Sequence, residues 1–274
     1  MDRDFTPDIR ENEPAANRER EQGPRPREVR KDRDDRYSIT DRQRETIVDI
    51  GKFRTVAVED LANHKYDGKS AVLREDVRSM LSQGIVQRRT ALVDKGRHKL
   101  TVLVLTKAGK RLAERGRIDP KQAVYSGFVK PNEVAHDAAI YRMFHKEAAK
   151  IVADGGSIKR VILDYELKKN VFSPLAKART LPTQQYARHQ AEIAQENGLK
   201  VINGKIPLPD LRIEYETAQG DMARVDLELA THHYHGSHLR EKVEAGFKMY
   251  GDAAATNRSP VFEEREITAA ILSL

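Results

Sequence analysis

Helix and strand signals over residues 37–117 follow one another in an order that few folds allow, and this order constrains the fold more than any other feature. Thr40 and Gln43 have the spacing of a capping box, and the apolar positions after them predict a helix that ends at Gly51. A β-prone run and a second short helix follow, at residues 55–58 and 59–64.

The second part of this segment predicts a longer helix and a hairpin. Ser70 is expected to cap a third helix that Gly84 ends. Two β-prone runs follow, joined by the turn Asp94-Lys95-Gly96-Arg97, and a last helix is capped by Thr106. The order helix, short strand, helix, helix and basic hairpin is typical of a winged helix-turn-helix.

The charge of the chain is concentrated in the same segment. Residues 37–117 hold 18 Lys and Arg against 10 Asp and Glu, a net charge of +8, whereas residues 118–274 hold 21 of each. Residues 1–36 hold 10 basic and 11 acidic residues with four prolines, a composition that predicts a disordered charged tail. A basic unit of domain size next to a neutral one favours binding to nucleic acid.

The winged-helix interpretation identifies candidate DNA contacts. The third helix would enter the major groove of double-stranded DNA, and the hairpin would meet phosphates. The candidates on and before this helix are Lys69, Ser70, Arg74 and Arg78, and those on the hairpin are Arg88, Arg89, Lys95, Arg97 and Lys99. A solvated basic surface and a protein-binding module stay open as alternatives.

After a Pro- and Gly-containing linker at 118–131, residues 132–274 predict an α/β domain with a mixed sheet. Asn132 is expected to cap a helix to about 153, and residues 157–168 read as a strand. A hairpin pattern and a final helix follow, at residues 211–217 with 222–230 and at 237–250.

Several motifs in this order resemble the replication-relaxation family of plasmids and other mobile elements. They are the basic winged helix, Val134-Ala135-His136-Asp137 at the start of the long helix, Leu208-Pro209-Asp210, and Val225-Asp226-Leu227-Glu228 followed by Lys242 and Tyr250. Separately, Leu105-Thr106-Lys107-Ala108-Gly109 resembles the end of many bacterial winged-helix domains. The resemblance to the replication-relaxation family covers roughly residues 37–250. It implies that the second half is similar to the restriction-endonuclease-like PD-(D/E)xK fold, and that the protein acts in plasmid replication, relaxation or conjugative mobilisation, or regulates those genes.

The PD-(D/E)xK pattern uses two carboxylates on neighbouring strands to hold Mg²⁺ or Mn²⁺, with a lysine two residues after the second acid. Asp210 would be the first acid, and Asp226 or Glu228 the second. The lysine position is then Glu228 or Ala230, so the lysine is missing unless Lys242 replaces it. Glu147 and Glu166 would be further carboxylates. Asp226 and Glu228 also fit the polar face of a half-buried strand.

Four histidines lie within seven residues, at positions 232, 233, 235 and 238. His233 and His235 match the His-hydrophobic-His pattern of rolling-circle nickases, in which two imidazoles hold a metal and a tyrosine attacks the phosphate. Tyr250 would be the nucleophile. A phosphate-contacting or solvated loop is the alternative.

Two functions of different classes follow. The first is a non-catalytic DNA-binding protein of a mobile element, and the second is a metal-dependent DNA endonuclease or nickase. A homodimer and contacts with other replication or mobilisation proteins stay open. The chain has no Cys, which excludes disulfides and thiolate zinc sites, and its apolar runs are too short for a membrane span, so a cytoplasmic protein without a membrane partner is expected.

Overall fold

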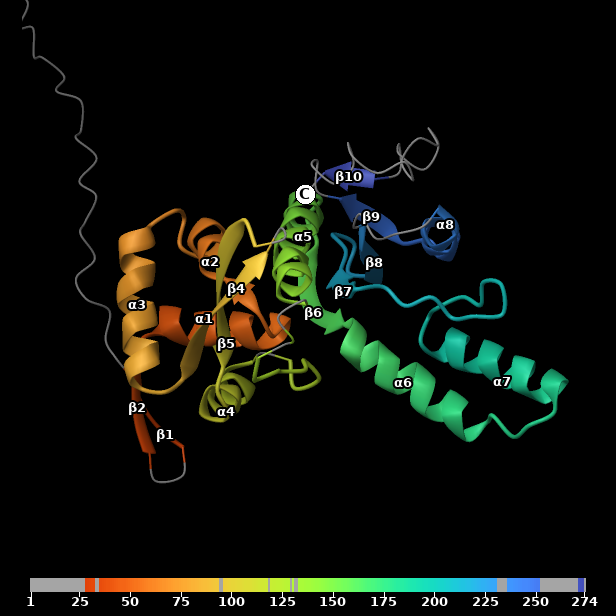
Figure 1. The fold of residues 1–274 in the computed structure, drawn as a ribbon, viewed down its shortest axis with the longest axis horizontal. Coiled ribbons are helices and arrows are strands. Elements are labelled where there is room, and N and C mark those ends of the chain that lie inside the picture. Colours follow the sequence, from red (N-terminus) through yellow and green to blue (C-terminus); the bar gives the residue numbers. More distant parts are fainter. Residues whose placement is uncertain are drawn as a thin grey trace, which may run out of the picture.

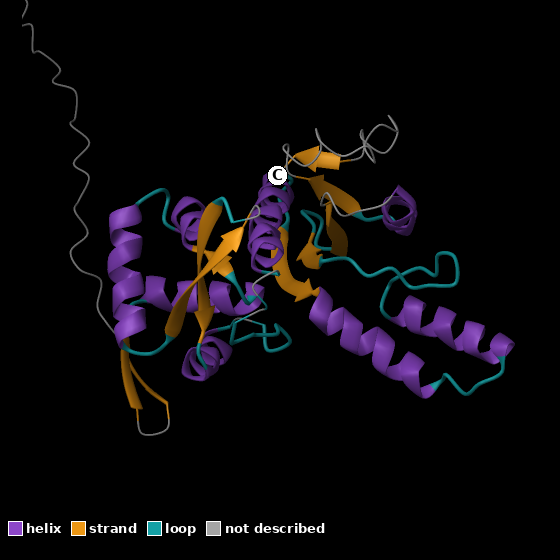
Figure 2. Ribbon diagram, viewed as in Figure 1, coloured by secondary structure: helices purple, strands orange, loops and turns teal. Residues whose placement is uncertain are grey.

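A computed structural model describes residues 28–32, 35–93, 96–117, 119–128, 130, 133–230, 236–251 and 271–273. These residues form a mixed α and β structure with helices, a three-stranded sheet, a five-stranded sheet and a two-stranded hairpin (Figures 1 and 2). The helices are α1 (Asp41–Phe53), α2 (Val58–Lys65), α3 (Ser70–Ser82), α4 (Lys107–Gly116), α5 (Val134–Ala153), α6 (Asp164–Lys177), α7 (Thr183–Glu196) and α8 (Gly236–Ala245). The strands are β1 (Glu28–Asp32), β2 (Asp35–Ile39), β3 (Val56–Ala57), β4 (Val86–Val93), β5 (His98–Leu105), β6 (Ser157–Leu163), β7 (Leu211–Glu216), β8 (Met222–Ala230), β9 (Lys248–Gly251) and β10 (Ile271–Ser273). None of the described helices is long and apolar enough to cross a membrane.

The helix starts in the first half follow from local capping. The Thr40 hydroxyl accepts the backbone N–H of Gln43, and the Gln43 side chain accepts the backbone N–H of Thr40, so the predicted capping box begins α1. The prediction that Ser70 caps α3 is wrong, because Ser70 is the first helical residue and Lys69 is the N-cap. The backbone N–H of Ser70 donates instead to the Gly68 carbonyl of the preceding turn.

The three-stranded sheet has the order β3-β5-β4, and both pairs are antiparallel. It is followed directly by α4, whose N-cap Thr106 accepts the backbone N–H of Gly109 at 3.0 Å. A Cβ at Gly109 would lie 2.1 Å from the Ile85 carbonyl oxygen. Glycine at this position therefore allows α4 to pack directly on the backbone that leads into β4.

The five-stranded sheet has the order β10-β9-β8-β7-β6. The pairs of β7 with β6 and β8 are antiparallel, while β9 runs parallel to β8 and β10. The sheet is thus mixed, as predicted, and α5 contacts β6, β7 and β8 along its length.

Three predicted elements differ from the structure. The strand expected over residues 157–168 ends at Leu163, and α6 begins at Asp164. The helix expected from Ser237 to Tyr250 ends at Ala245, and Tyr250 lies on β9. The tail interpretation is wrong for residues 28–32 and 35–36, which belong to the β1–β2 hairpin, and residues 1–27 lie outside the described part of the chain.

The start of α5 also differs. Glu133 is the N-cap of α5, and Asn132, the expected cap, lies outside the described residues.

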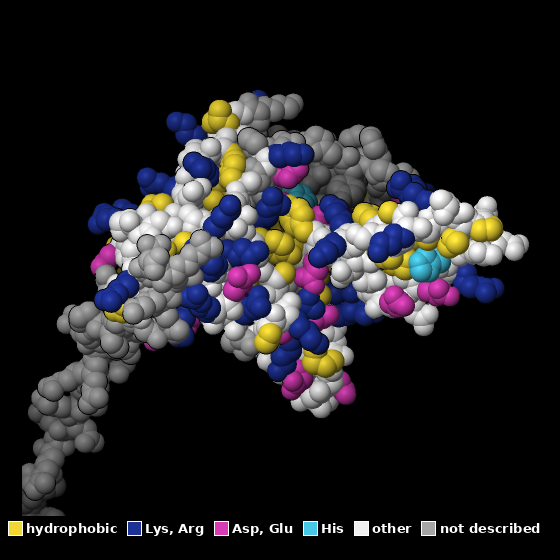
Figure 3. Space-filling model, turned by 90° about the horizontal axis from the view of Figure 1, so that it is seen from below, with side chains coloured by type: hydrophobic (Ala, Val, Ile, Leu, Met, Phe, Trp, Pro, Cys, Tyr) yellow, Lys and Arg dark blue, Asp and Glu magenta, His cyan; other side chains and the backbone are white. Residues whose placement is uncertain are grey.

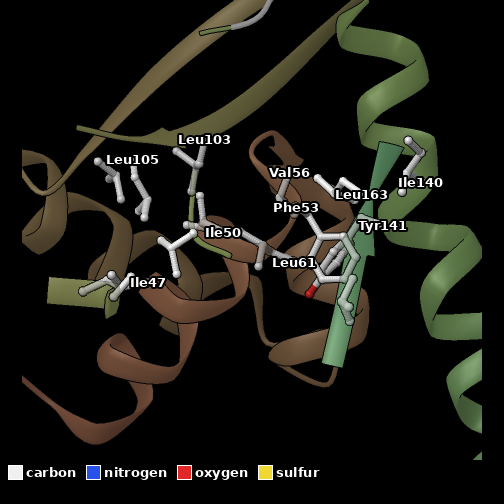
Figure 4. Close-up of a cluster of buried hydrophobic side chains, with 14 of the residues drawn as sticks. Ile47, Ile50, Phe53, Val56, Leu61, Leu103, Leu105, Ile140, Tyr141 and Leu163 are labelled. Carbon is white, nitrogen blue, oxygen red and sulfur yellow. The ribbon is translucent and has the colours of Figure 1, made fainter. Parts of the chain in front are cut away.

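The two halves share one core. The ring of Phe53 on α1 packs edge-on against that of Tyr141 on α5, with centroids 5.0 Å apart (Figure 4). Both side chains belong to a buried apolar cluster that also contains Leu61, Leu105 and Leu163. A single packed core across the two halves fixes their relative positions.

The segment expected as a linker is part of this packing. Gln122 is buried, its side-chain amide donates to the Val161 carbonyl and its Oε1 accepts the Val161 N–H, each at 2.8 Å. Two residues later Val124 is buried, and the Tyr125 N–H donates to the Gly51 carbonyl. Residues 122–125 therefore pack between β6 and α1 and are not a flexible linker.

Candidate nucleic-acid interface and carboxylate cluster

Helix α3 has one buried face and one exposed face. Leu73, Val77 and Met80 are buried at helical spacing against the rest of the first half. The predicted DNA contacts of this region, Lys69, Ser70, Arg74 and Arg78, are all exposed. The helix thus presents three cations and a hydroxyl to solvent on a rigid support.

A buried carboxylate holds α3 against α1. Asp76, which is 3% exposed, accepts hydrogen bonds from Arg42 Nε at 2.6 Å, Gln43 Nε2 at 2.9 Å and the Tyr66 hydroxyl at 3.1 Å. The hydrogen bond to Asp76 raises the pKa of Arg42, and burial raises that of Tyr66. Three donors on one buried carboxylate fix the orientation of the exposed face of α3.

The β4–β5 hairpin carries the other predicted contacts. Arg88, Arg89, Arg97 and Lys99 are exposed, and Lys95 lies outside the described residues. A shallow surface depression of ≈ 620 Å³ connects α3 and β4, and its lining residues are Leu81, Gly84, Val86, Gln87, Arg88, Arg89 and Thr106. Guanidinium groups at the edge of a depression next to α3 are suited to phosphate oxygens.

Asp210 and Glu228 meet at the edge where β7 begins. Asp210 donates its backbone N–H to Glu228 Oε2 at 3.1 Å, and Asp210 Oδ2 accepts the Leu229 N–H at 2.9 Å. The antiparallel register, in which Leu211 faces Leu227, brings the two acids together. Lys242 on α8 places its Nζ 2.8 Å from Glu228 Oε1, and Glu228 is fully buried. The structure therefore brings together three of the four predicted catalytic residues.

His136, at the start of α5, belongs to this cluster, although the sequence motifs did not predict it as a site residue. Its Nε2 lies 3.4 Å from Asp210 Oδ2, and its Nδ1 lies 3.5 Å from Asp137 Oδ1. Burial alone would lower the pKa of His136, but the hydrogen bonds and charges of Asp137 and Asp210 outweigh burial and raise it to about 10. The His-Asp dipeptide in the first turn of the long predicted helix was the available signal.

Asp226 forms an ion pair with Arg212 and is not part of the Asp210–Glu228 cluster. Arg212 donates from Nε to Asp226 Oδ1 at 2.6 Å and from a terminal nitrogen to Oδ2 at 2.9 Å, and it also donates to the Asn197 carbonyl at 2.6 Å. This bidentate pair across β7 and β8 is buried on the arginine side. Asp226 therefore ties the strands to the end of α7 and does not contact Asp210.

The two additional carboxylates are also bound elsewhere. Glu147 accepts hydrogen bonds from Lys248 and from the Tyr250 hydroxyl, each at 2.6 Å. Glu166 is paired with Arg160. Neither residue joins the cluster of Asp210 and Glu228.

The cluster does not fit a divalent cation in this arrangement. Cations of the protein, Lys242 and His136, already face the two carboxylates. Within the described ranges, no group of three or more His, Asp or Glu side chains has an arrangement that would hold a metal ion. Binding of Mg²⁺ or Mn²⁺ by Asp210, Asp226 and Glu228 would require Arg212 to release Asp226 and Lys242 to move.

The structure does not leave Tyr250, the predicted nickase nucleophile, free to attack a phosphate. Burial and the hydrogen bond to Glu147 raise the pKa of Tyr250, whose hydroxyl also accepts a hydrogen bond from Lys150 at 2.8 Å. Tyr250 is fully buried on β9. His233 and His235 lie outside the described residues.

No protein-family model matches the chain, and searches among curated proteins and among solved structures found no match.

Proposed function

We propose that residues 37–117 form a winged-helix unit and that the chain is a double-stranded DNA-binding protein of a mobile element. It acts in plasmid replication, relaxation or conjugative mobilisation, or in regulation of those genes. The order α1, β3, α2, α3, β4, β5 and α4 supports the winged helix. The resemblance of the motifs to the replication-relaxation family supports the biological setting.

The observation that carries the proposal is the exposed face of α3. Arg74 and Arg78 are exposed and lie one turn apart, while Asp76 between them is bonded into the core. A helix anchored on one side and cationic on the other is the arrangement that places side chains against base edges and phosphates. The hairpin cations add sequence-independent phosphate contacts.

In this proposal the second half is a nuclease-like domain that binds without cutting. Asp210, directly before β7, and Glu228 on β8 lie next to each other, and their charges face His136 and Lys242. Ion pairs within the protein stabilise the carboxylates without a metal. The domain thereby keeps its shape while its acids are neutralised.

Fluorescence anisotropy with a labelled 40-base-pair duplex tests the proposal. Affinity should fall steeply as the salt concentration rises. The slope of log binding constant against log salt concentration should be about −0.9 for each phosphate contacted. The double variant Arg74→Ala and Arg78→Ala should bind about tenfold more weakly or worse. Lys121→Ala with Lys205→Ala removes two other exposed cations and should bind like the wild type. A flat salt response would refute DNA binding.

A metal-dependent endonuclease is the second candidate, because Asp210, Glu228 and Lys242 are in contact through one hydrogen bond and one ion pair. Supercoiled plasmid incubated with the protein and Mg²⁺ or Mn²⁺ separates the two functions. Nicking that disappears in Asp210→Ala would establish the endonuclease. Intact plasmid with both metals, at a protein concentration that saturates the DNA, supports the non-catalytic protein.

A further inference from the structure

Helices α6 and α7 form an arm that extends away from the five-stranded sheet (Figure 1). The arm is inserted between β6 and β7, and its two helices pack on each other through buried apolar side chains. Val171 and Leu175 on α6 belong to the same buried cluster as Ile193 and Ala194 on α7. The inward faces of the arm are therefore already occupied, and its outward faces are left to solvent.

The outer part of the arm is basic although the second half of the chain has no net charge. Residues 167–191 contain five Lys and Arg and no Asp or Glu. The acids of the arm lie near its base, where α6 begins with Asp164 and Glu166 and α7 ends after Glu192 and Glu196. The cations thus extend from the second turn of α6 to the far end of the arm, where the sequence has no acid.

Most of these cations have no acidic partner. Lys168 pairs with Asp164. Within the part of the chain that the structure describes, no ion pair involves Lys169, Lys177, Arg179 or Arg188, and all four are exposed. Lys177 and Arg179 lie at the C-terminal end of α6, where the helix dipole stabilises cations. Lys169 and Arg188 lie inside their helices, so the dipole does not account for their positions.

The surroundings of the cations suit a polyanion with many oxygen acceptors. The turn between the helices and the start of α7 expose short hydroxyl and amide side chains, at Thr180, Thr183, Gln184 and Gln185. Hydroxyl, amide and cationic groups together are the usual donors to DNA phosphates. Lys and Arg side chains are spread over the face seen from below, from the half with the three-stranded sheet to the arm (Figure 3).

We propose that the α6–α7 arm is a second DNA-binding element, which contacts the phosphate backbone outside the stretch bound by α3 and the hairpin. The inference rests on the proposed function and extends it, because it assigns part of the DNA affinity to the second half. The contacts are sequence-independent, since they involve phosphates and no base edges.

The test compares three variants of the full chain on the labelled 40-base-pair duplex between 50 and 300 mM salt. The arm variant carries Lys169→Gln, Lys177→Gln and Arg188→Gln, and glutamine keeps the helix propensity of these positions. The control variant carries Lys121→Gln, Lys130→Gln and Lys205→Gln, which removes three other exposed cations. The third variant is Arg74→Ala with Arg78→Ala. Circular dichroism checks that each variant keeps its helices.

In the arm variant, the plot of log binding constant against log salt concentration should be less steep by about 2 to 3, and binding at the lowest salt should be at least about tenfold weaker. The control variant should stay near the wild type in both respects. Wild-type affinity and slope in the arm variant, together with weak binding by the α3 variant, would overturn the inference and leave the proposed function intact. Wild-type behaviour of both variants would overturn both.

Two other results would reassign the arm. If the arm variant loses affinity for a 40-nucleotide single-stranded RNA but not for the duplex, the arm is an RNA-binding element and the inference is wrong. Loss of binding to poly-glutamate with unchanged duplex affinity would assign it to an acidic protein and would equally overturn the inference.

Discussion

His136 lies between two carboxylates, and their charges outweigh the cost of burying its imidazolium. Its folded pKa of about 10 lies above the unfolded value near 6.5. Protonation of His136 therefore stabilises the fold fully below pH 6.5, and this contribution is lost as the pH rises through 10. Asp210 behaves in the opposite sense, because His136 lowers its pKa despite burial, so its contribution is lost as the pH falls below 3.8.

An NMR titration of the imidazole tests this coupling. The His136 ring, assigned through the loss of its signal in His136→Gln, should titrate with a pKa of about 10. Asp210→Asn removes one of the two negative charges and should lower that pKa by about 1 to 3. Asp226→Asn is the matched control, because Asp226 pairs with Arg212. Titration of His136 near pH 6.5 in the wild type would contradict the coupling.

The sequence predicted part of this cluster. Asp210 and Glu228 were expected on neighbouring strands, and the β7–β8 register brings them into hydrogen-bonding contact. The alternation of polar and apolar residues along β8 could not show that Arg212 binds Asp226. That pair forms because β7, which carries Arg212, lies beside β8. The position of His136 depends on the packing of α5 against the sheet, which no local pattern contains.

Among the elements, α4 depends on a close contact with the chain before β4. Helix propensity alone would favour Gly109→Ala by about 1 kcal/mol. The added Cβ would lie 2.1 Å from the Ile85 carbonyl oxygen, and backbone must move to relieve the overlap. We therefore expect a net loss of about 1 to 3 kcal/mol in the free energy of unfolding, measured by urea denaturation. Lys110→Ala on the same helix should change it by less than about 0.5 kcal/mol. A more stable Gly109→Ala protein would contradict the close contact.

The orientation of α3 depends on Asp76. Asp76→Ala leaves the buried Gln43 side-chain amide without its acceptor and Arg42 without its carboxylate, while the Tyr66 hydroxyl keeps only its hydrogen bond with Thr46. Because Arg42 is 37% exposed, the expected loss of stability is about 2 to 4 kcal/mol, somewhat less than the roughly 3 to 5 kcal/mol for a fully buried pair. The adjacent Glu75→Ala, which changes an exposed carboxylate on the same helix, should cost less than about 0.5 kcal/mol. Equal stabilities of the two variants in urea would contradict this role.

Elements with their own local signals were predicted well. The capping box of α1, the Thr106 cap of α4 and the β7–β8 hairpin lie where the sequence placed them. The boundary between β6 and α6 was missed because Val161, Leu163 and Tyr165 alternate as a strand would, although the chain turns helical at Asp164. The strands at residues 28–32 and 35–36 were missed because a β hairpin next to α3 and α4 depends on contacts that charged composition does not reveal.

At the scale of the whole molecule, aromatic rings join the two halves where α2 meets α5. The rings of His64 and His145 are stacked, with centroids 4.5 Å apart and planes 3° from parallel. Burial, then the charges of His64, Lys65 and Lys52, lower the pKa of His145 to about 4. A neutral His145 is therefore part of the contact between the first half of the chain and α5, which packs on the five-stranded sheet.

This contact makes stability depend on pH in a definite direction. The folded pKa of His145 lies below the unfolded value near 6.5, so its contribution is complete above pH 6.5 and is lost as the pH falls toward 4. Between pH 7 and pH 5 the wild type should lose about 2 kcal/mol of unfolding free energy relative to His145→Phe, measured by urea denaturation at both pH values. His98→Phe changes an exposed histidine and should follow the wild type. Parallel pH dependences of wild type and His145→Phe would show that His145 is protonated equally in the folded and unfolded chain, and would exclude a desolvated imidazole at the junction of the two halves.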